Sequence, residues 1–285
     1  MTTPNSPVPP AATRRETDPA ASAGETLLLA IDSSTAVAGL ALIRGDAALL
    51  EISWRSVAAH TVELAPRLRW LLGETHTSPR DLGAIAVCLG PGSYNGLRAG
   101  ISMAKGLAFA LGVPILGISG LETVAHQASA GGAASVPVCA LQPAAGTSQR
   151  GLPLVAAALF RAGERGLHRE RAEQIVDLAE LCGWLVEPTL VCGELTPELR
   201  REIQTRRATG AVARLAPPLT SQRRPLAIAE LALRRMAAGE ADDAAALQPL
   251  YLRPPNITAP KAVGATHASP LHAAATGAGE PTSQT

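Results

Sequence analysis

The segment Leu89-Gly90-Pro91-Gly92-Ser93-Tyr94-Asn95-Gly96-Leu97-Arg98-Ala99-Gly100 joins an apolar run to a helical pattern through a glycine-rich turn. The preceding residues 84–89 are all apolar and predict a buried strand. Ser93 or Asn95 can cap a helix that continues to about Leu111. A strand, a glycine turn and a helix N-terminus often form an anion site, because free N–H groups point outward there. Many such turns bind nothing, so this feature alone predicts no ligand.

The predicted helix, residues 96–111, carries small residues at every fourth position: Gly96, Gly100, Ala104 and Ala108. Residues four apart lie along one face of a helix. A ridge of small residues lets another helix approach closely. Together with Leu97 from the adjacent apolar stripe, this ridge is our candidate contact surface for a partner chain.

Composition limits both the size of the fold and its function. Residues 1–24 and 256–285 are rich in small and polar residues without an apolar period, which predicts two disordered tails. The net charge of +1 argues against a dominant nucleic-acid-binding surface. The scarcity of aromatic residues argues against an RNA-stacking platform. No long apolar run or hydrophobic signal segment is present, so we expect a soluble, cytoplasmic protein.

The order of predicted elements indicates an α/β fold with two related βββαβα-type halves, of which the second is degraded. Three adjacent strands with short connections suggest an antiparallel meander, after which strand and helix alternate. We expect a first subdomain over residues 25–130, a smaller second one over 131–222, and a closing segment, 223–253, that packs on the first. The expected strands cover 27–31, 37–43, 47–54, 84–89, 114–118, 136–141, 152–160, 168–175 and 189–192, and the expected helices 61–72, 96–111, 178–184, one after 195, and 225–238.

Several blocks of sequence resemble the bacterial TsaB family, also called YeaZ. The first five blocks lie between residues 27 and 127, and the last closes the ordered part. The same order of strands, with Asp-Ser-Ser-Thr ending the first, is that of the actin-like ATPase (ASKHA) fold. The blocks are Ile31-Asp32-Ser33-Ser34-Thr35, His60-Thr61-Val62-Glu63-Leu64-Ala65-Pro66, Gly90-Pro91-Gly92-Ser93-Tyr94-Asn95-Gly96-Leu97-Arg98, Ala104-Lys105-Gly106-Leu107-Ala108, Gly117-Ile118-Ser119-Gly120-Leu121-Glu122 and Pro249-Leu250-Tyr251-Leu252-Arg253.

The resemblance implies a scaffold subunit without catalytic residues. Such a subunit pairs with the transferase TsaD, together with the ATPase TsaE, to threonylcarbamoylate an adenosine beside the anticodon of certain tRNAs. The resemblance places the dimer surface on the helix of residues 96–111. It implies that tRNA is met only through the complex and that ATP or ADP can lie at the partner interface; a homodimer stays open. The family's Asp-Ala-Arg block is replaced here by Gln142-Pro143-Ala144, at the start of a longer stretch, 142–150, that we expect to be flexible.

Asp32, Ser33, Ser34 and Thr35 stand where actin-like ATPases hold a phosphate. Those enzymes prefer Gly before the Thr, because the backbone can then approach phosphate closely, whereas this chain has Ser34. We therefore interpret Asp32 as a turn-capping residue, with at most a weak nucleotide contact at these four positions. The alternative is an active actin-like ATPase or kinase.

A metal site and a hydrolase are not favoured by the residues present. The catalytic paralogue carries an H-x-x-x-H pair whose positions correspond to Gly120 and Val124, which cannot bind a metal. The six histidines contain no pair four residues apart, so we predict no bound metal and regard a glycoprotease-like hydrolase as the weaker alternative. The four cysteines show no C-x-x-C spacing and are interpreted as small buried side chains. The arginine pairs 206–207 and 223–224 are interpreted as solvated surface.

Overall fold

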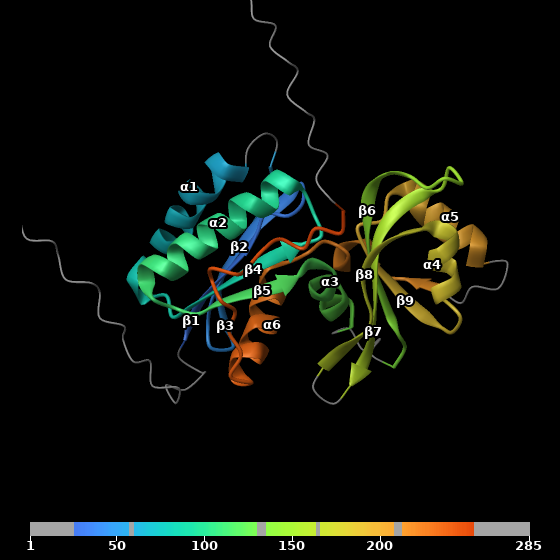
Figure 1. Ribbon diagram of the computed structural model, residues 1–285. Helices are drawn as coiled ribbons and strands as arrows, with labels where there is room; N and C mark the ends of the chain where they lie inside the picture. The colour runs from blue at the N-terminus through green and yellow to red at the C-terminus, as the bar shows by residue number, and fades with distance from the viewer. Residues whose placement is uncertain (1–25, 57–59, 130–134, 164–165, 208–212, 254–285) are drawn as a thin grey trace, which may run out of the picture. The chain divides into compact units, whose positions relative to one another are not determined.

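The computed structural model describes residues 26–56, 60–129, 135–163, 166–207 and 213–253. These residues form two five-stranded mixed sheets with helices on both faces (Figure 1). The two predicted tails, 1–24 and 256–285, lie outside the described residues. No helix in the described ranges has both the length and the hydrophobicity that crossing a bilayer requires.

The first sheet has the strand order β3-β2-β1-β4-β5. β1 pairs antiparallel with β2 and parallel with β4, and β4 pairs parallel with β5. This is the predicted meander followed by right-handed crossover units. Its elements are β1 (Leu27–Asp32), β2 (Val37–Arg44), β3 (Ala47–Arg55), α1 (His60–Glu74), a short 3₁₀ turn η1 (Pro79–Asp81), β4 (Ala84–Gly90), α2 (Tyr94–Leu111) and β5 (Ile115–Ser119).

The second sheet has the order β10-β9-β6-β7-β8, which repeats the topology of the first. All five strands are present, and the predicted degradation of the second half is confined to the reduced length of single helices and strands. The elements of this half are β6 (Val138–Thr147), β7 (Pro153–Gly163), β8 (Gly166–Asp177), α4 (Leu178–Trp184), β9 (Thr189–Gly193), α5 (Pro197–Arg207) and the three-residue β10 (Ala213–Leu215).

Each sheet is covered by two helices on one face and by one helix on the other. α1 and α2 lie side by side on the first sheet (Figure 1), and α4 and α5 pack on the second. The opposite faces are covered by helices taken from the other half of the chain. α3 (Gly120–Ser129) follows the first sheet but packs on the second, and α6 (Pro225–Ala237) follows the second but packs on the first. The chain boundary at 130/131 stays a prediction.

Alternation along the strands places successive residues on opposite faces of the sheet. In β1, Leu27, Leu29 and Ile31 face the α1–α2 layer, whereas Leu28 and Ala30 face α6. Period-two alternation produces this division in any strand buried on both sides. A short 3₁₀ turn, η2 (Pro218–Thr220), then leads the chain back from β10 to α6.

Candidate functional site

The turn at residues 32–35 is buried and braced by its own side chains. Asp32 is 2% exposed and lies at the end of β1. Its Oδ1 accepts a hydrogen bond from the backbone N–H of Ser34 at 2.9 Å and another from the Ser34 hydroxyl. The predicted turn-capping role of Asp32 is thus confirmed.

Arg223 occupies the space in front of this turn. Its side chain is buried, and Nε lies 3.8 Å from Oδ2 of Asp32. The guanidinium also donates to the carbonyl of Pro91 at 3.4 Å and to Oε1 of Gln142 at 3.2 Å. The prediction that Arg223 is solvated surface is wrong, because the buried carboxylate of Asp32 requires a counter-charge. The prediction holds for the neighbouring Arg224, whose side chain is 57% exposed and pairs with Glu51.

Two glycines allow this close packing. A Cβ added to Gly92 would overlap the backbone carbonyl of Ser34, and one added to Gly120 would overlap Nη1 of Arg223. The glycine loop after β4 therefore approaches the chain's own turn, and Ser93 N donates to Ser34 O at 2.6 Å. A nucleotide phosphate at residues 32–35 would have to displace Arg223. The weak nucleotide contact at these residues stays a prediction that the geometry disfavours.

Cys88, on β4, completes the surroundings of the turn. Burial raises the pKa of its thiol to about 11, so the group is neutral at pH 7. The thiol lies 3.4 Å from the Ser34 hydroxyl, and its sulfur accepts from Arg223 at 3.5 Å. A neutral buried thiol of this kind is a packing group rather than a nucleophile.

The positions that correspond to metal-binding histidines in the paralogue are occupied by packing residues. Gly120 lies against Arg223, and Val124 is buried in the core beneath α3. Within the described ranges, no three His, Cys, Asp or Glu side chains come together as a metal site. His126 of α3 instead pairs with Glu230 of α6, with 2.7 Å between Nε2 and Oε2.

The residues of our candidate partner surface are buried in this chain. The five predicted interface residues, Gly96, Leu97, Gly100, Ala104 and Ala108, are all buried inside their own half of the chain. The Ser33 hydroxyl donates to the Gly96 carbonyl at 2.7 Å, and a Cβ on Gly100 would overlap that hydroxyl. The ridge does serve a close approach, as its spacing predicts, but the neighbour is β1 and the Asp32 turn. A contact between this ridge and another chain stays a prediction that the burial of the ridge disfavours.

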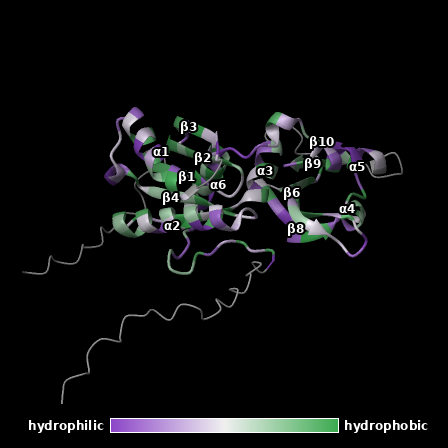
Figure 2. Ribbon diagram, turned by 90° about the horizontal axis from the view of Figure 1, so that it is seen from above, coloured by the Kyte–Doolittle hydropathy of each residue, from purple (hydrophilic) through white to green (hydrophobic). Residues whose placement is uncertain are grey.

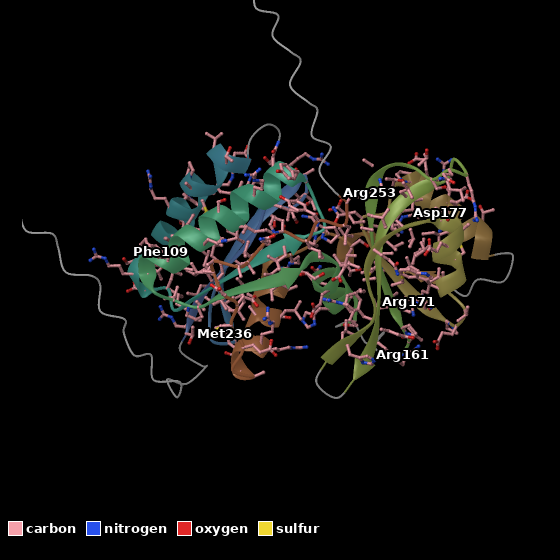
Figure 3. The ribbon with its side chains drawn as sticks, in the orientation of Figure 1. Phe109, Arg161, Arg171, Asp177, Met236 and Arg253 are labelled. Carbon is pink, nitrogen blue, oxygen red and sulfur yellow. The ribbon has the colours of Figure 1, made fainter. Side chains whose placement is uncertain are left out.

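The opposite, outer face of α2 is free of such contacts and carries an unusually exposed aromatic residue. Phe109 is 89% exposed near the C-terminal end of α2 (Figure 3). The neighbouring α1 exposes Val62 and Trp70 in the same layer. We refer to the exposed apolar residues Val62, Trp70 and Phe109 as the outer helical face. We take these three exposed apolar side chains as a candidate interaction surface.

The closing segment ties the N-terminus of α2 to the second sheet. Tyr251 stacks on Tyr94 with ring centroids 5.3 Å apart, and Arg98 donates to the Tyr94 hydroxyl at 2.7 Å. Arg253 donates to the Ala145 carbonyl of β6 at 2.9 Å. The sequence pattern predicts this segment but not its stacking partner, because nothing local links two tyrosines so far apart in the chain.

Comparison with known proteins identifies the class and then the family. The two sheets with matching strand order, covered by helices on both faces, define an α/β protein of the actin-like (ASKHA) class. The fold resembles the crystal structures described as "YeaZ from Pseudomonas aeruginosa" (TM-score 0.64) and as a protein with similarity to the peptidase YeaZ from the same organism (TM-score 0.65). Each of the two is 26% identical to this chain. Each match covers 80% of this chain and 100% of the solved structure.

The sequence places the chain within one family of this class. The family model "TsaD: tRNA N6-adenosine threonylcarbamoyltransferase" matches residues 55–207, more than half of the chain, so the chain belongs to this family. It is a homologue of the tRNA threonylcarbamoyladenosine biosynthesis protein TsaB. It is 42% identical to the Bacillus subtilis protein over 98 residues and 37% identical to the Escherichia coli protein over 103 residues. These alignments cover 34% and 35% of the chain and 43% of each relative, so less than half of each relative is matched in sequence.

Proposed function

We propose that this protein is a non-catalytic subunit in tRNA threonylcarbamoyladenosine biosynthesis and that it pairs with a TsaD-type transferase. The relatives named TsaB support the pathway. The observation that carries the non-catalytic role is Arg223, which fills the place of a phosphate beside Asp32. A TsaE-type ATPase completes the proposed complex. tRNA contacts this chain only through that complex, in the cytoplasm.

The proposed contact with the transferase is the outer helical face rather than the small-residue ridge. Burying a phenylalanine removes on the order of 150–250 Å² of surface from water, which makes Phe109 the strongest anchor on this face. The corresponding helix of the second sheet, α5, is strongly polar, as its purple colour in Figure 2 shows. A partner that binds through apolar contacts is therefore expected on α1 and α2.

The experiment is a pull-down with the tagged full chain from its native lysate, with the captured proteins identified by mass. We expect a TsaD-type transferase to be captured by the native chain. Phe109→Glu should lower its capture at least about tenfold, because a charge would be desolvated at the contact. Leu219→Glu is the matched control, since Leu219 is 91% exposed on η2, away from α1 and α2.

Two results would contradict the proposal. Absence of any TsaD-type protein from the native capture would remove the proposed partner. Equal loss with Phe109→Glu and Leu219→Glu would show that the outer helical face is not the contact. ATP turnover by the isolated chain that Asp32→Ala abolishes would instead favour an active ATPase.

A further inference from the structure

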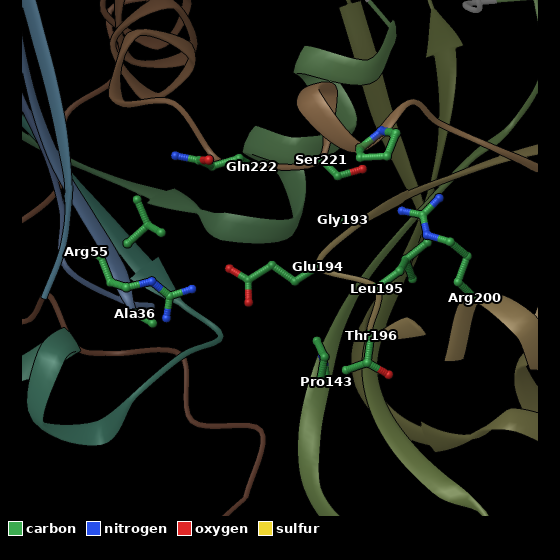
Figure 4. A pocket seen from close by; sticks show the side chains of 12 residues that line it. Ala36, Arg55, Pro143, Gly193, Glu194, Leu195, Thr196, Arg200, Ser221 and Gln222 are labelled. Atoms are coloured by element: carbon green, nitrogen blue, oxygen red, sulfur yellow. The ribbon is translucent and has the colours of Figure 1, made fainter. Parts of the chain in front are cut away.

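A cavity of about 380 Å³ lies between the two sheets, next to the residues that follow the Asp32 turn (Figure 4). It is formed by the ends of β2 and β3, by the loop after β9, by the first turn of α5 and by the segment before Arg223. Ligand pockets commonly have volumes of roughly 300–1,000 Å³, so this one suits a small metabolite.

Three charged side chains line the cavity. Arg55 ends β3, Glu194 follows β9, and Arg200 lies in the first turn of α5. Within the described residues, none of the three takes part in a side-chain hydrogen bond or close ion pair, and the negative charge of Glu194 acts at longer range on the buried Arg223 guanidinium. In Figure 4 the Glu194 carboxylate and the Arg55 guanidinium point toward one another across the space, while Arg200 enters from the α5 side. Other arginines of the molecule, such as Arg161 and Arg235, are paired with carboxylates.

The surroundings of these charges disfavour a phosphate. The N-terminus of α5 is already used, because Thr196 Oγ1 accepts from the Leu199 N–H at 3.2 Å. A phosphate placed there would meet the carboxylates of Glu194 and Glu198. The phosphate position beside Asp32 is closed by Arg223. The cavity therefore does not suit a nucleotide.

A ligand that carries one charge of each sign matches the lining. Its ammonium group can pair with Glu194, and its carboxylate with the guanidinium groups. Apolar residues Val37, Leu195 and Pro218 complete the wall and suit an aliphatic body. We propose that this cavity binds a free amino acid as a zwitterion, held by Glu194 and by Arg55 and Arg200.

The test is ligand-observed NMR on the full chain with each of the twenty protein amino acids at up to about 10 mM, a range that detects millimolar dissociation constants. The strongest binder is then titrated beside its N-acetylated and its amidated derivative. We expect saturable binding of the amino acid and at least about tenfold weaker binding of each derivative, because each lacks one of the two charges.

Variants assign the binding to this cavity. Glu194→Gln and the double variant Arg55→Gln with Arg200→Gln should each weaken binding at least about tenfold. Glu187→Gln is the control, since Glu187 pairs with Arg161 and does not line the cavity. Thermal melts establish that each variant is folded.

The proposal is overturned if no amino acid binds, if the derivatives bind as well as the amino acid, or if the cavity variants bind like the native chain. Tighter binding of AMP or ATP than of any amino acid, lost in Glu194→Gln, would overturn it in favour of a nucleotide. None of the substituted residues belongs to the outer helical face, so this test and the pull-down can fail separately.

Discussion

The two sheets share one topology but differ at the ends of corresponding strands. β4 and β9 occupy equivalent places, and each ends in a glycine with positive φ, Gly90 at 104° and Gly193 at 109°. The first of these turns leads into the 18-residue α2, whereas the second leads into the 11-residue, polar α5. The two halves thus share the backbone conformation of this turn but differ in the length and polarity of the helix that follows.

The ends of β1 and β6 differ in a way that explains the closed site. β1 ends in Asp32, but at the corresponding place β6 continues through Gln142 into a longer hairpin with β7. Arg223 pairs with the carboxylate on one side and donates to the neutral amide on the other. Where a nucleotide would bridge two lobes, this chain's own guanidinium contacts both. Arg223 is therefore a joint between the two halves.

The largest effect is expected from removal of that joint. Arg223→Met leaves Asp32 buried without a counter-charge, which should lower the free energy of unfolding by about 3–5 kcal/mol. Urea denaturation measures the loss. Arg224→Met is the matched neighbour: the Arg224 side chain is 57% exposed while Glu51 is 14% exposed, so the loss of this half-exposed pair should cost about 1 kcal/mol, less than the loss of Arg223.

A double variant separates charge from packing. Arg223→Met combined with Asp32→Asn removes both charges, so it should lose less stability than Arg223→Met alone. If Arg223→Met stays within about 1 kcal/mol of the native chain, the guanidinium is not the joint between the halves.

The next effect compares the two glycine turns. Gly193→Ala combines an unfavourable φ with overlap of the Leu141 carbonyl, a backbone atom that cannot move aside. Gly90→Ala has a similar φ, but its nearest neighbour, at 3.0 Å, is the flexible side chain of Leu97. Gly239→Ala has φ of 76° and no neighbour within 4 Å, so it reports backbone strain alone, about 1 kcal/mol.

We expect the losses of unfolding free energy to rank Gly193 above Gly90 above Gly239, with Gly193→Ala at about 3 kcal/mol or more. Chemical denaturation of the three variants gives the order. Equal losses at Gly193 and Gly239 would show that the second turn is not locked against β6.

Local sequence patterns predicted most of the strands and helices of the first sheet, but not which other parts of the chain pack against them. The strand at 84–89, the Ser93 cap and the helix to Leu111 are confirmed, because each depends on residues close in sequence. The stretch 142–150, expected to be flexible, instead extends β6 to Thr147 through pairing with β7. Its pairing partner is the next strand in the chain, so this hairpin was a local signal that our prediction missed. Asp32, the partner of Arg223, lies far away in the chain, so no local signal reveals that pair.

The small-residue ridge shows the same limit more sharply. A four-residue spacing predicts that a helix face is closely approached, but it does not identify the approaching element. The approaching element is identified only by the structure, in which the Ser33 hydroxyl just after β1 donates a hydrogen bond to the Gly96 carbonyl of the ridge. The position of Phe109 on the opposite side could be read from the helix period, but its exposure could not.

The smallest effect tests the two faces of α2 directly. Ala104 is fully buried against the first sheet, so Ala104→Leu should overpack the core and lower the free energy of unfolding by about 1–3 kcal/mol. Ala110→Leu makes the same change on the exposed face of the same helix and should stay within about 0.5 kcal/mol of the native chain. Because the helix propensity of both residues is high, the difference reports packing rather than helix formation.

Partner binding supplies the second readout on the same proteins. After correction for the folded fraction, Ala104→Leu should bind the transferase like the native chain, since its new side chain points into the core. A stable Ala104→Leu variant that has lost partner binding would return the contact to the ridge and remove the outer helical face from the proposal.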